Sequence, residues 1–208
     1  LTANPLIGRF SDRLVAMGGS TLLTEVPEMF GAESLLMARC ETESVFNDTV
    51  RLINGFKRYY EDNHQTIYEN PSPGNKAGGI STLEDKALGC TQKSGDAPVT
   101  AVLPYSGQVT RDGLHLLSAP GNDLVATTAL AAAGAQLVLF STGRGTPFGG
   151  PVPTLKIASN TALALRKKSW IDFNAGALLE GNTLDTLTDE LTRLVLDTAS
   201  GRLARNEE

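Results

Sequence analysis

The chain has 208 residues, 41% of them hydrophobic and 20% charged, which suits a sizeable globular domain with its own core. Its net charge of -5 is scattered in both signs, and this excludes the clustered basic face that nucleic-acid binding requires. The longest apolar stretch, residues 124–140, is interrupted by threonine, glycine and glutamine, so no membrane span is expected either.

The chain start and the cysteines suggest the context in which this domain works. Residues 1–5 contain neither an initiator methionine nor the features of a secretory signal. We therefore expect that an upstream, N-terminal part of the polypeptide is absent. Cys40 and Cys90 lie in separate segments without redox or metal-binding spacing, which favours a reducing, cytoplasmic location.

Helices and strands alternate along the first part of the chain. Asn4 as a cap, Pro5 at the first helical position and the Gly-Gly pair at 18–19 predict a helix between them. Residues 20–25 are typical of a short buried strand. Residues 43–63 have the apolar spacing of a long helix.

An irregular segment follows at 70–79. Two prolines and three glycines in ten residues exclude a regular helix or a central strand there. Ser81 and Glu84 then form a capping box that opens a helix toward residue 89. Residues 70–80 are also the candidate boundary if the chain divides into two lobes.

The remaining elements keep the alternation. Strands are predicted at 99–103, 114–118 and 135–140, and helices at 122–133, 161–168 and 184–199, with a disordered tail from Arg205. Strands that alternate with helices predict an α/β fold. Its expected form is a layered, largely parallel sheet flanked by helices, as in Rossmann-like proteins.

The strongest chemical feature is the segment 142–146, directly after an apolar strand. Ligands gather at the carboxyl ends of strands in open α/β sheets. Glycines on both sides of Arg144 let the backbone turn sharply, and the guanidinium can bind a carboxylate through two hydrogen bonds. The alternative is a structural arginine that binds loop carbonyls, and the residues alone do not decide between the two.

Two further groups of residues could carry chemistry. Asn75 and Lys76 could meet a polyhydroxylated acid, although composition alone favours an exposed linker with a solvated lysine. Glu25 and Glu28 stand at the end of a predicted strand, where carboxylates can bind a divalent metal or act as a base. Three nearby acids, including Glu33, are more often simply solvated.

Three segments resemble the galactarate and altronate dehydratase family: residues 1–8, the Asn-Pro-Ser-Pro-Gly-Asn-Lys run within 70–79, and Thr-Gly-Arg-Gly-Thr-Pro-Phe-Gly at 142–149. The resemblance extends to about residue 201, and it implies that 1–208 is the C-terminal, catalytic-region domain of a longer polypeptide. Residues 24–33 are more similar to the altronate branch than to the galactarate branch.

The resemblance implies a hydro-lyase that removes water from D-altronate to give 2-dehydro-3-deoxy-D-gluconate in hexuronate breakdown. It also implies a divalent metal, with iron(II) favoured and manganese(II) as the alternative. Family members carry an N-terminal domain and a preceding Gly-Gly-Ser-Asp segment, so the resemblance implies that this chain alone is inactive.

Chemical plausibility then assigns roles to these positions. Arg144 would hold the substrate carboxylate, Thr142 and Thr146 would orient hydroxyl groups, and Asn75 would hold the sugar chain. Lys76 or Glu25 is the candidate acid/base, and Glu25 with Glu28 the candidate metal ligands. The alternatives are a galactarate dehydratase or sulfolactate sulfo-lyase of the same family, or a non-catalytic sugar-acid-binding module. A homo-oligomer is left open.

Overall fold

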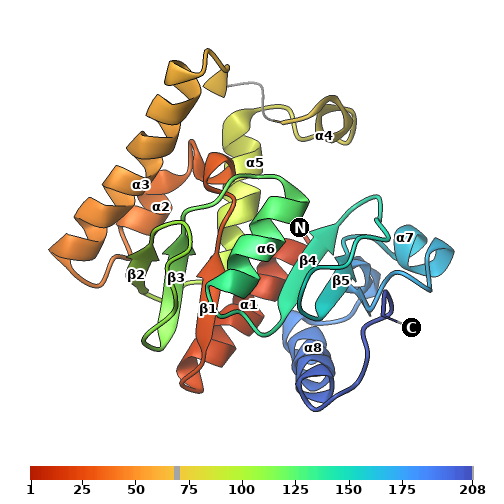
Figure 1. The fold of residues 1–208 in the computed structure, drawn as a ribbon. Helices are drawn as coiled ribbons and strands as arrows, with labels where there is room; N and C mark the ends of the chain where they lie inside the picture. The colour runs from red at the N-terminus through yellow and green to blue at the C-terminus, as the bar shows by residue number, and fades with distance from the viewer. Residues whose placement is uncertain (68–70, 208) are drawn as a thin grey trace.

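Two parallel three-stranded sheets organise the chain (Figure 1). The structure is a computed structural model that describes residues 1–67 and 71–207. The first sheet has the order β1-β3-β2 and the second the order β4-β5-β6. Every strand pairing is parallel, which confirms the predicted α/β class. The strands are β1 (Ser20–Leu23), β2 (Val99–Leu103), β3 (Gly113–Leu117), β4 (Val138–Thr142), β5 (Thr154–Ala158) and β6 (Phe173–Asn174).

Helices surround both sheets (Figure 1). In the part of the chain that the structure describes, no helix is long and apolar enough to cross a bilayer. The α-helices are α1 (Ala3–Ala16), α2 (Glu33–Met37), α3 (Glu43–Asp62), α4 (Pro73–Ala77), α5 (Leu83–Thr91), α6 (Asp123–Ala132), α7 (Thr161–Arg166) and α8 (Leu184–Ala199). The 3-10 helices are η1 (Val26–Met29), η3 (Gln92–Ser94) and η4 (Ala175–Glu180).

The predicted helix at the start exists, but Asn4 does not cap it. Thr2 occupies the cap position of α1. The Asn4 amide instead donates to the carbonyl of Gly89 at 2.7 Å, which ties α1 to α5. The Asn4 side chain, which the local pattern predicted as the helix cap, therefore makes a tertiary contact instead.

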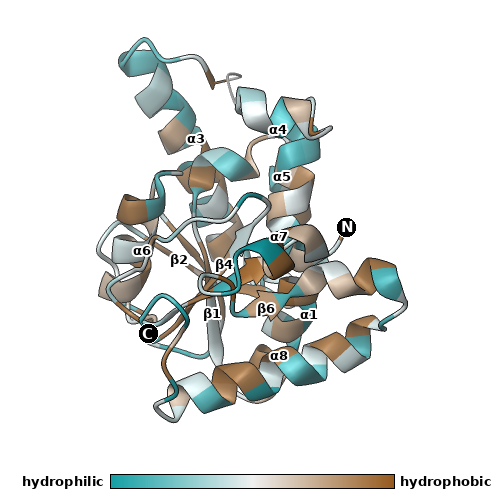
Figure 2. Cartoon of the chain, turned by 90° about the vertical axis from the view of Figure 1, so that its right-hand side faces the viewer, coloured by the Kyte–Doolittle hydropathy of each residue, from teal (hydrophilic) through white to brown (hydrophobic). Residues whose placement is uncertain are grey.

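Helices α1 and α8 cover the second sheet. Their shared core contains Leu6, Ile7 and Phe10 of α1 with Leu191 of α8 and Ile157 of β5. Figure 2 shows α8 lying beneath α1 with hydrophobic and hydrophilic residues alternating along it, as expected of a half-buried helix.

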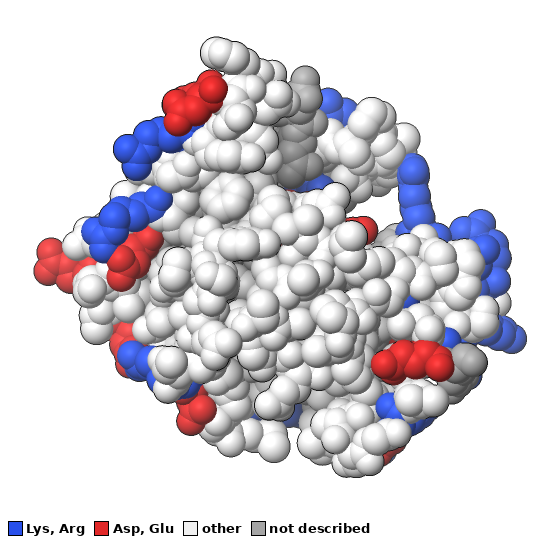
Figure 3. Space-filling model, in the orientation of Figure 1, with Lys and Arg blue, Asp and Glu red and all other residues white. Residues whose placement is uncertain are grey.

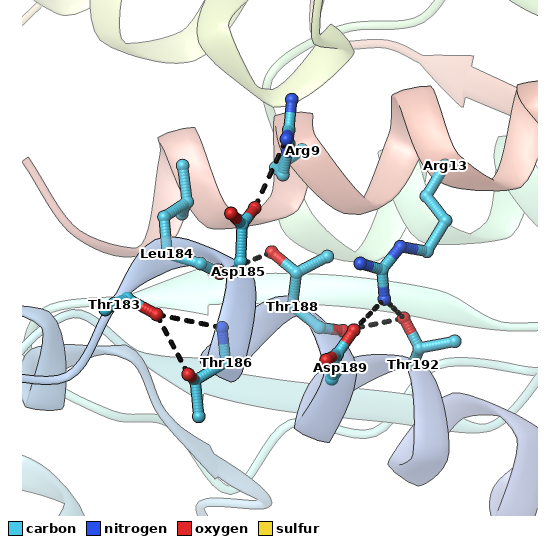
Figure 4. A network of polar contacts seen from close by, with 9 residues as sticks. All are labelled: Arg9, Arg13, Thr183, Leu184, Asp185, Thr186, Thr188, Asp189 and Thr192. Carbon is cyan, nitrogen blue, oxygen red and sulfur yellow. Dashed lines mark hydrogen bonds and ion pairs between the residues drawn. The ribbon is translucent and has the colours of Figure 1, made fainter.

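Ion pairs join the exposed edges of the same two helices (Figure 4). Arg9 lies 3.2 Å from Asp185, and Arg13 lies 2.6 Å from Asp189. Exposed pairs of this kind contribute about 0–1 kcal/mol each. The apolar contacts therefore carry most of the α1–α8 packing.

Helix α3 confirms the helix predicted at 43–63 and covers the first sheet. The Thr42 hydroxyl caps it by accepting from the backbone N–H of Val45 at 3.2 Å. Its buried residues Leu52 and Ile53 pack into a core with Leu114 and other side chains of the first sheet. This core also contains residues of η1, so it supports the segment that carries Glu25 and Glu28.

The prediction missed the central strand of the second sheet. All five residues of β5 are buried, including Lys156 at its centre. A lysine interrupts the apolar run from which a buried strand is recognised, so residues 154–158 gave no strand signal.

Lys156 is a buried cation with no hydrogen-bond partner for its Nζ among the described residues. Burial lowers the pKa of Lys156, and nearby Asp172 offsets part of this effect. Asp172 itself accepts from the backbone N–H groups of Lys156 and Arg205, so it does not depend on the ammonium.

We expect Lys156→Met to raise the free energy of unfolding by about 1–3 kcal/mol, because it removes an unsatisfied buried charge and keeps the side-chain volume. Urea denaturation at pH 7 measures this change. The exposed Lys168→Met serves as the control and should leave the midpoint unchanged. A lower midpoint for Lys156→Met would show that the ammonium stabilises the fold.

Three local predictions need correction. Helix α5 is capped by Thr82, whose hydroxyl accepts from Asp85 N–H at 3.1 Å, and the predicted Ser81–Glu84 box is absent. The segment 71–79 contains the short helix α4, because its proline stands at the first helical position, where no N–H is needed; residue 70 lies outside the described residues. The tail makes defined contacts instead of the predicted disorder: Ala204 is buried, and its N–H donates to the Glu207 carboxylate at 2.8 Å.

Candidate functional site

A cavity of about 310 Å³ lies beside the carboxyl end of β1, between the first sheet and β4 of the second. Its volume is at the lower end of the range of small-molecule sites. Its position agrees with the rule that ligands bind at the carboxyl ends of parallel strands. Polar or charged side chains from seven segments line it: Asn4, Thr24, Glu25, Glu28, Asn75, Asp85, Lys86, Cys90, Lys93, Asp123, Thr127 and Ser141.

Glu25 is held in an unusual backbone conformation between β1 and η1. Its φ of 62° and ψ of 57° are left-handed, which is costly for a residue with a side chain. Neighbouring contacts enforce this turn: the N–H of Val26 donates to Ala119 O at 3.0 Å, and the Thr24 hydroxyl donates to Leu117 O at 3.1 Å. Residues in such conformations cluster at functional sites.

Burial, and after it the charge of Glu28, raise the pKa of Glu25 to about 7 against the opposing effect of Lys93. A carboxyl group in this state exchanges a proton near neutral pH, as general acid/base catalysis requires. The structure thus places one of the two predicted acid/base residues in a suitable environment.

Glu28 has the opposite character. One of its oxygens lies 2.7 Å from Lys86 Nζ, and the other accepts from the Cys90 thiol at 2.8 Å. Burial raises the pKa of Glu28, but Lys93, Lys86 and the hydrogen bond from Cys90 outweigh burial, so the pKa is lowered. Two neighbouring carboxyl groups with pKa values pushed apart are typical of catalytic sites.

Lys93 completes this cluster. Its Nζ lies 4.0 Å from Glu25 Oε2, which is an ion-pair distance but too long for a hydrogen bond. Burial lowers the pKa of Lys93, but Cys90 and the carboxylates of Glu25, Glu28 and Asp123 reverse this effect, so the pKa is raised. Lys93 is therefore a lasting positive charge within the cavity.

Sequence reasoning missed Lys86, Cys90 and Lys93. They stand four and then three residues apart on α5 and η3, so the helical repeat brings them to one face. This spacing was readable as a polar stripe. The cysteine was instead interpreted as a small apolar residue, but burial and the bond to Glu28 raise the pKa of its thiol to about 12, and it acts as a donor.

The segments 71–79 and 142–146, which carry predicted site residues, lie against each other. Arg144 donates to the carbonyl of Gly74 at 3.3 Å, and neighbouring Asn75 lines the cavity. Arg144 and Lys76 are both exposed, and neither is among the cavity-lining residues. Arg144 therefore stands at the rim, beside α4, while Asn75 reaches the interior wall.

The two predicted threonines shape the loop after β4. The Thr142 hydroxyl accepts from Gly145 N–H at 2.9 Å, and the Thr146 hydroxyl accepts from Phe148 N–H at 3.2 Å. Both side chains thus stabilise turns that hold Arg144 in place. Their substrate contacts stay a prediction.

Glu25 and Glu28 fit a divalent metal poorly. Both oxygens of Glu28 already have partners, and two ammonium groups stand beside the pair. Across 1–67 and 71–207, no group of three or more histidine, cysteine, aspartate or glutamate side chains could hold a metal ion. The donor set of this chain thus resembles an acid/base cluster more than a metal centre.

Comparison with known families identifies the chain. The whole of residues 1–208 matches the family model described as D-galactarate/Altronate dehydratase, C-terminal. The chain belongs to this family. The resemblance inferred from the three segments is therefore confirmed.

Individual members of the D-galactarate/altronate dehydratase family show the same relationship. The chain is 61% identical to altronate dehydratase of Bacillus subtilis (strain 168) and 58% identical to that of Escherichia coli (strain K12), in each case over the whole chain and 42% of the relative. It is 37% identical to galactarate dehydratase (L-threo-forming) of E. coli (strain K12), over 97% of the chain and 39% of that relative. The chain thus spans about two fifths of these relatives, and its similarity is higher to the altronate branch.

Proposed function

We propose that this chain is part of a hydro-lyase that converts D-altronate to 2-dehydro-3-deoxy-D-gluconate and water, and that Glu25 is the acid/base residue it contributes. The observation that carries this proposal is the Glu25 carboxyl, whose pKa of about 7 is set by burial in a cavity of about 310 Å³ next to Glu28 and Lys93. The identities of 58% and 61% to altronate dehydratases support the choice of substrate.

The reaction needs a base near the carbon next to the substrate carboxylate. The Glu25 carboxylate takes the proton from C2, and the electron pair forms the C2–C3 double bond as the C3–O bond breaks. The C3 hydroxyl takes a proton from the protonated Glu25 or from Lys76 and leaves as water, and the resulting enol converts to the 2-keto acid. A negative charge grows on the substrate carboxylate during proton removal, so nearby positive charge accelerates this step.

Residues on the wall and at the rim of the cavity have a supporting role in this proposal. Asn75 on the cavity wall and Arg144 beside it bind hydroxyl groups of the sugar chain, and Lys76 is the second candidate for a proton-transfer group. Arg144 as the carboxylate ligand is the weaker assignment, because it is exposed and already binds Gly74 O.

Iron(II), with manganese(II) as the alternative, remains part of the proposal for the complete enzyme. Both carboxylate oxygens of Glu28 already have partners in Lys86 and Cys90. We therefore propose that other parts of the complete enzyme supply the metal ligands. We also propose a cytoplasmic location, supported by the two free cysteines.

The pH dependence of the reaction follows from Glu25. Its base form is present above pH about 7 and is lost below it, so we expect kcat/KM to fall about tenfold per pH unit on the acid side. In Lys93→Met this limb should move to higher pH, because the charge of Lys93 lowers the pKa of Glu25. If kcat/KM of the wild type fell only around the ordinary carboxyl pKa, and not around pH 7, the assignment would be contradicted.

The function is tested by assaying a longer polypeptide that contains this chain, with the 208-residue chain in parallel. D-altronate, D-galactarate and sulfolactate are supplied with iron(II), with manganese(II) and after chelation. We expect metal-dependent 2-keto acid formation from D-altronate by the longer form. Turnover of galactarate or sulfolactate, but not of D-altronate, would change the proposed substrate. If none of the three acids were turned over, a sugar-acid-binding module would be favoured.

A further inference from the structure

We infer that Lys93 binds the carboxylate of the sugar acid and thereby directs the C2 proton toward Glu25. The inference rests on the proposed dehydration and adds a substrate-binding residue to it. It assigns to Lys93 the carboxylate-binding role that sequence analysis gave to Arg144.

The first support is the unfilled bonding capacity of Lys93. Its ammonium carries three donors, yet no hydrogen bond from it is found within 1–67 and 71–207, and its ion-pair partner Glu25 lies 4.0 Å away. Lys86, only seven residues earlier, contrasts with it because its Nζ lies 2.7 Å from Glu28. Lys93 lines the cavity, and 22% of its side chain remains accessible there.

The second support is the position of Lys93 relative to the base. A carboxylate oxygen bound to an ammonium lies about 2.7–2.9 Å from it. Because Glu25 Oε2 is 4.0 Å from the same Nζ, the bound carboxylate would stand directly beside the Glu25 side chain. The carbon whose proton must be removed is one bond from that carboxylate. A single contact thus anchors the substrate and presents its reactive carbon.

The third support is the charge balance of the cavity. The ionised Glu28 is paired with Lys86, while Lys93 faces Glu25, which is only partly ionised near neutral pH, and Asp123 at the start of α6. Among the described residues that line the cavity, Lys93 is thus the ammonium that no carboxylate holds at hydrogen-bond distance, so it can bind one carboxylate group, as in a sugar acid. A phosphate with two charges would meet repulsion from the surrounding carboxylates. The positive charge of Lys93 also stabilises the enediolate-like transition state more strongly than the bound substrate, because negative charge grows on the carboxylate.

The test compares ligands that differ only in the charge of the group that Lys93 would bind. We propose 3-deoxy-D-altronate and its neutral 1-carboxamide, because neither has a C3 hydroxyl to lose and both can be titrated calorimetrically without turnover. Wild type, Lys93→Met, Lys93→Arg and the exposed control Lys168→Met are compared in the longer polypeptide.

We expect Lys93→Met to weaken binding of the acid by about 10- to 100-fold, as for the loss of a charge-assisted hydrogen bond, while binding of the amide hardly changes. Lys93→Arg should retain part of the preference for the acid, and Lys168→Met all of it. A structural role for Lys93 would weaken both ligands equally, and such a result would overturn the inference.

Failure of the inference is distinguishable from failure of the proposed function. Suppose that the longer polypeptide dehydrates D-altronate and that Lys93→Met keeps the preference for the acid over the amide. This result would refute only the carboxylate-binding role of Lys93. A wild type that neither dehydrates D-altronate nor binds either ligand would overturn the proposed function and the inference together.

Discussion

Glu25→Gln in the longer polypeptide is expected to lower kcat for D-altronate dehydration by about 10²- to 10⁴-fold, the usual contribution of a positioned general base. The amide keeps the size and polarity of the side chain but cannot accept the C2 proton. Binding of non-reacting sugar acids should persist, because Lys93 keeps its charge. Initial rates of 2-keto acid formation, with calorimetric titration of 3-deoxy-D-altronate, measure both effects.

A matched control keeps this prediction specific. Glu33 lies in the same acidic stretch, but its carboxylate binds Lys57 at 2.8 Å and does not line the cavity. Glu33→Gln should therefore leave kcat within about twofold of wild type, since it lies outside the site. If Glu25→Gln turned over D-altronate as fast as this control, Glu25 would not be the base, and Lys76 would become the remaining candidate.

Gly8→Ala is expected to lower the free energy of unfolding by about 3 kcal/mol or more, as overpacking against rigid backbone does. A Cβ at residue 8 would stand 2.1 Å from the carbonyl oxygen of Gln92 and 3.1 Å from the backbone nitrogen of Gly95. These neighbours are main-chain atoms of η3 and its end, so they cannot rotate away. Helix α1 must then separate from η3.

The matched substitution is Gly55→Ala in α3, where nothing lies within 4 Å of the added Cβ. It should stabilise the chain by about 0.5–1 kcal/mol through helix propensity. Urea denaturation compares the two variants. Because η3 carries Lys93, Gly8→Ala should also weaken binding of 3-deoxy-D-altronate at temperatures where the variant is folded. Equal unfolding midpoints for Gly8→Ala and wild type would show that the α1–η3 contact can relax.

The sequence predicted the elements whose signals are local. The amphipathic pattern of 43–63, the Gly-Gly turn at 18–19 and the apolar strands at 99–103 and 114–118 each depend on neighbouring residues, and the structure has a corresponding element at each. Glu25 and Glu28 were chosen for a similar reason, because a strand end followed by a proline is visible in the chain. The structure places both in one cavity.

The missed elements share a different cause. Strand β5 carries the buried Lys156, and Asn4 leaves the cap of α1 to bind Gly89, so in both cases a tertiary environment overrides the local pattern. Similarly, Cys90 has the local pattern of an apolar residue, but in the structure its thiol donates a hydrogen bond to Glu28, 62 residues away in the chain.

The sequence by itself thus determined the parallel α/β class, the family, and the carboxylates at the end of β1. Each of these depends on a periodic pattern or on a contiguous motif, which can be recognised without the tertiary structure. Only the tertiary structure decided which residues share the cavity and what charge they carry there. Lys93 and Glu25 are 4.0 Å apart because η3 packs against β1 and α5 packs against η1. The shifted pKa of Glu25 arises from burial and from neighbours distant in the chain, and neither is encoded in the residues around it.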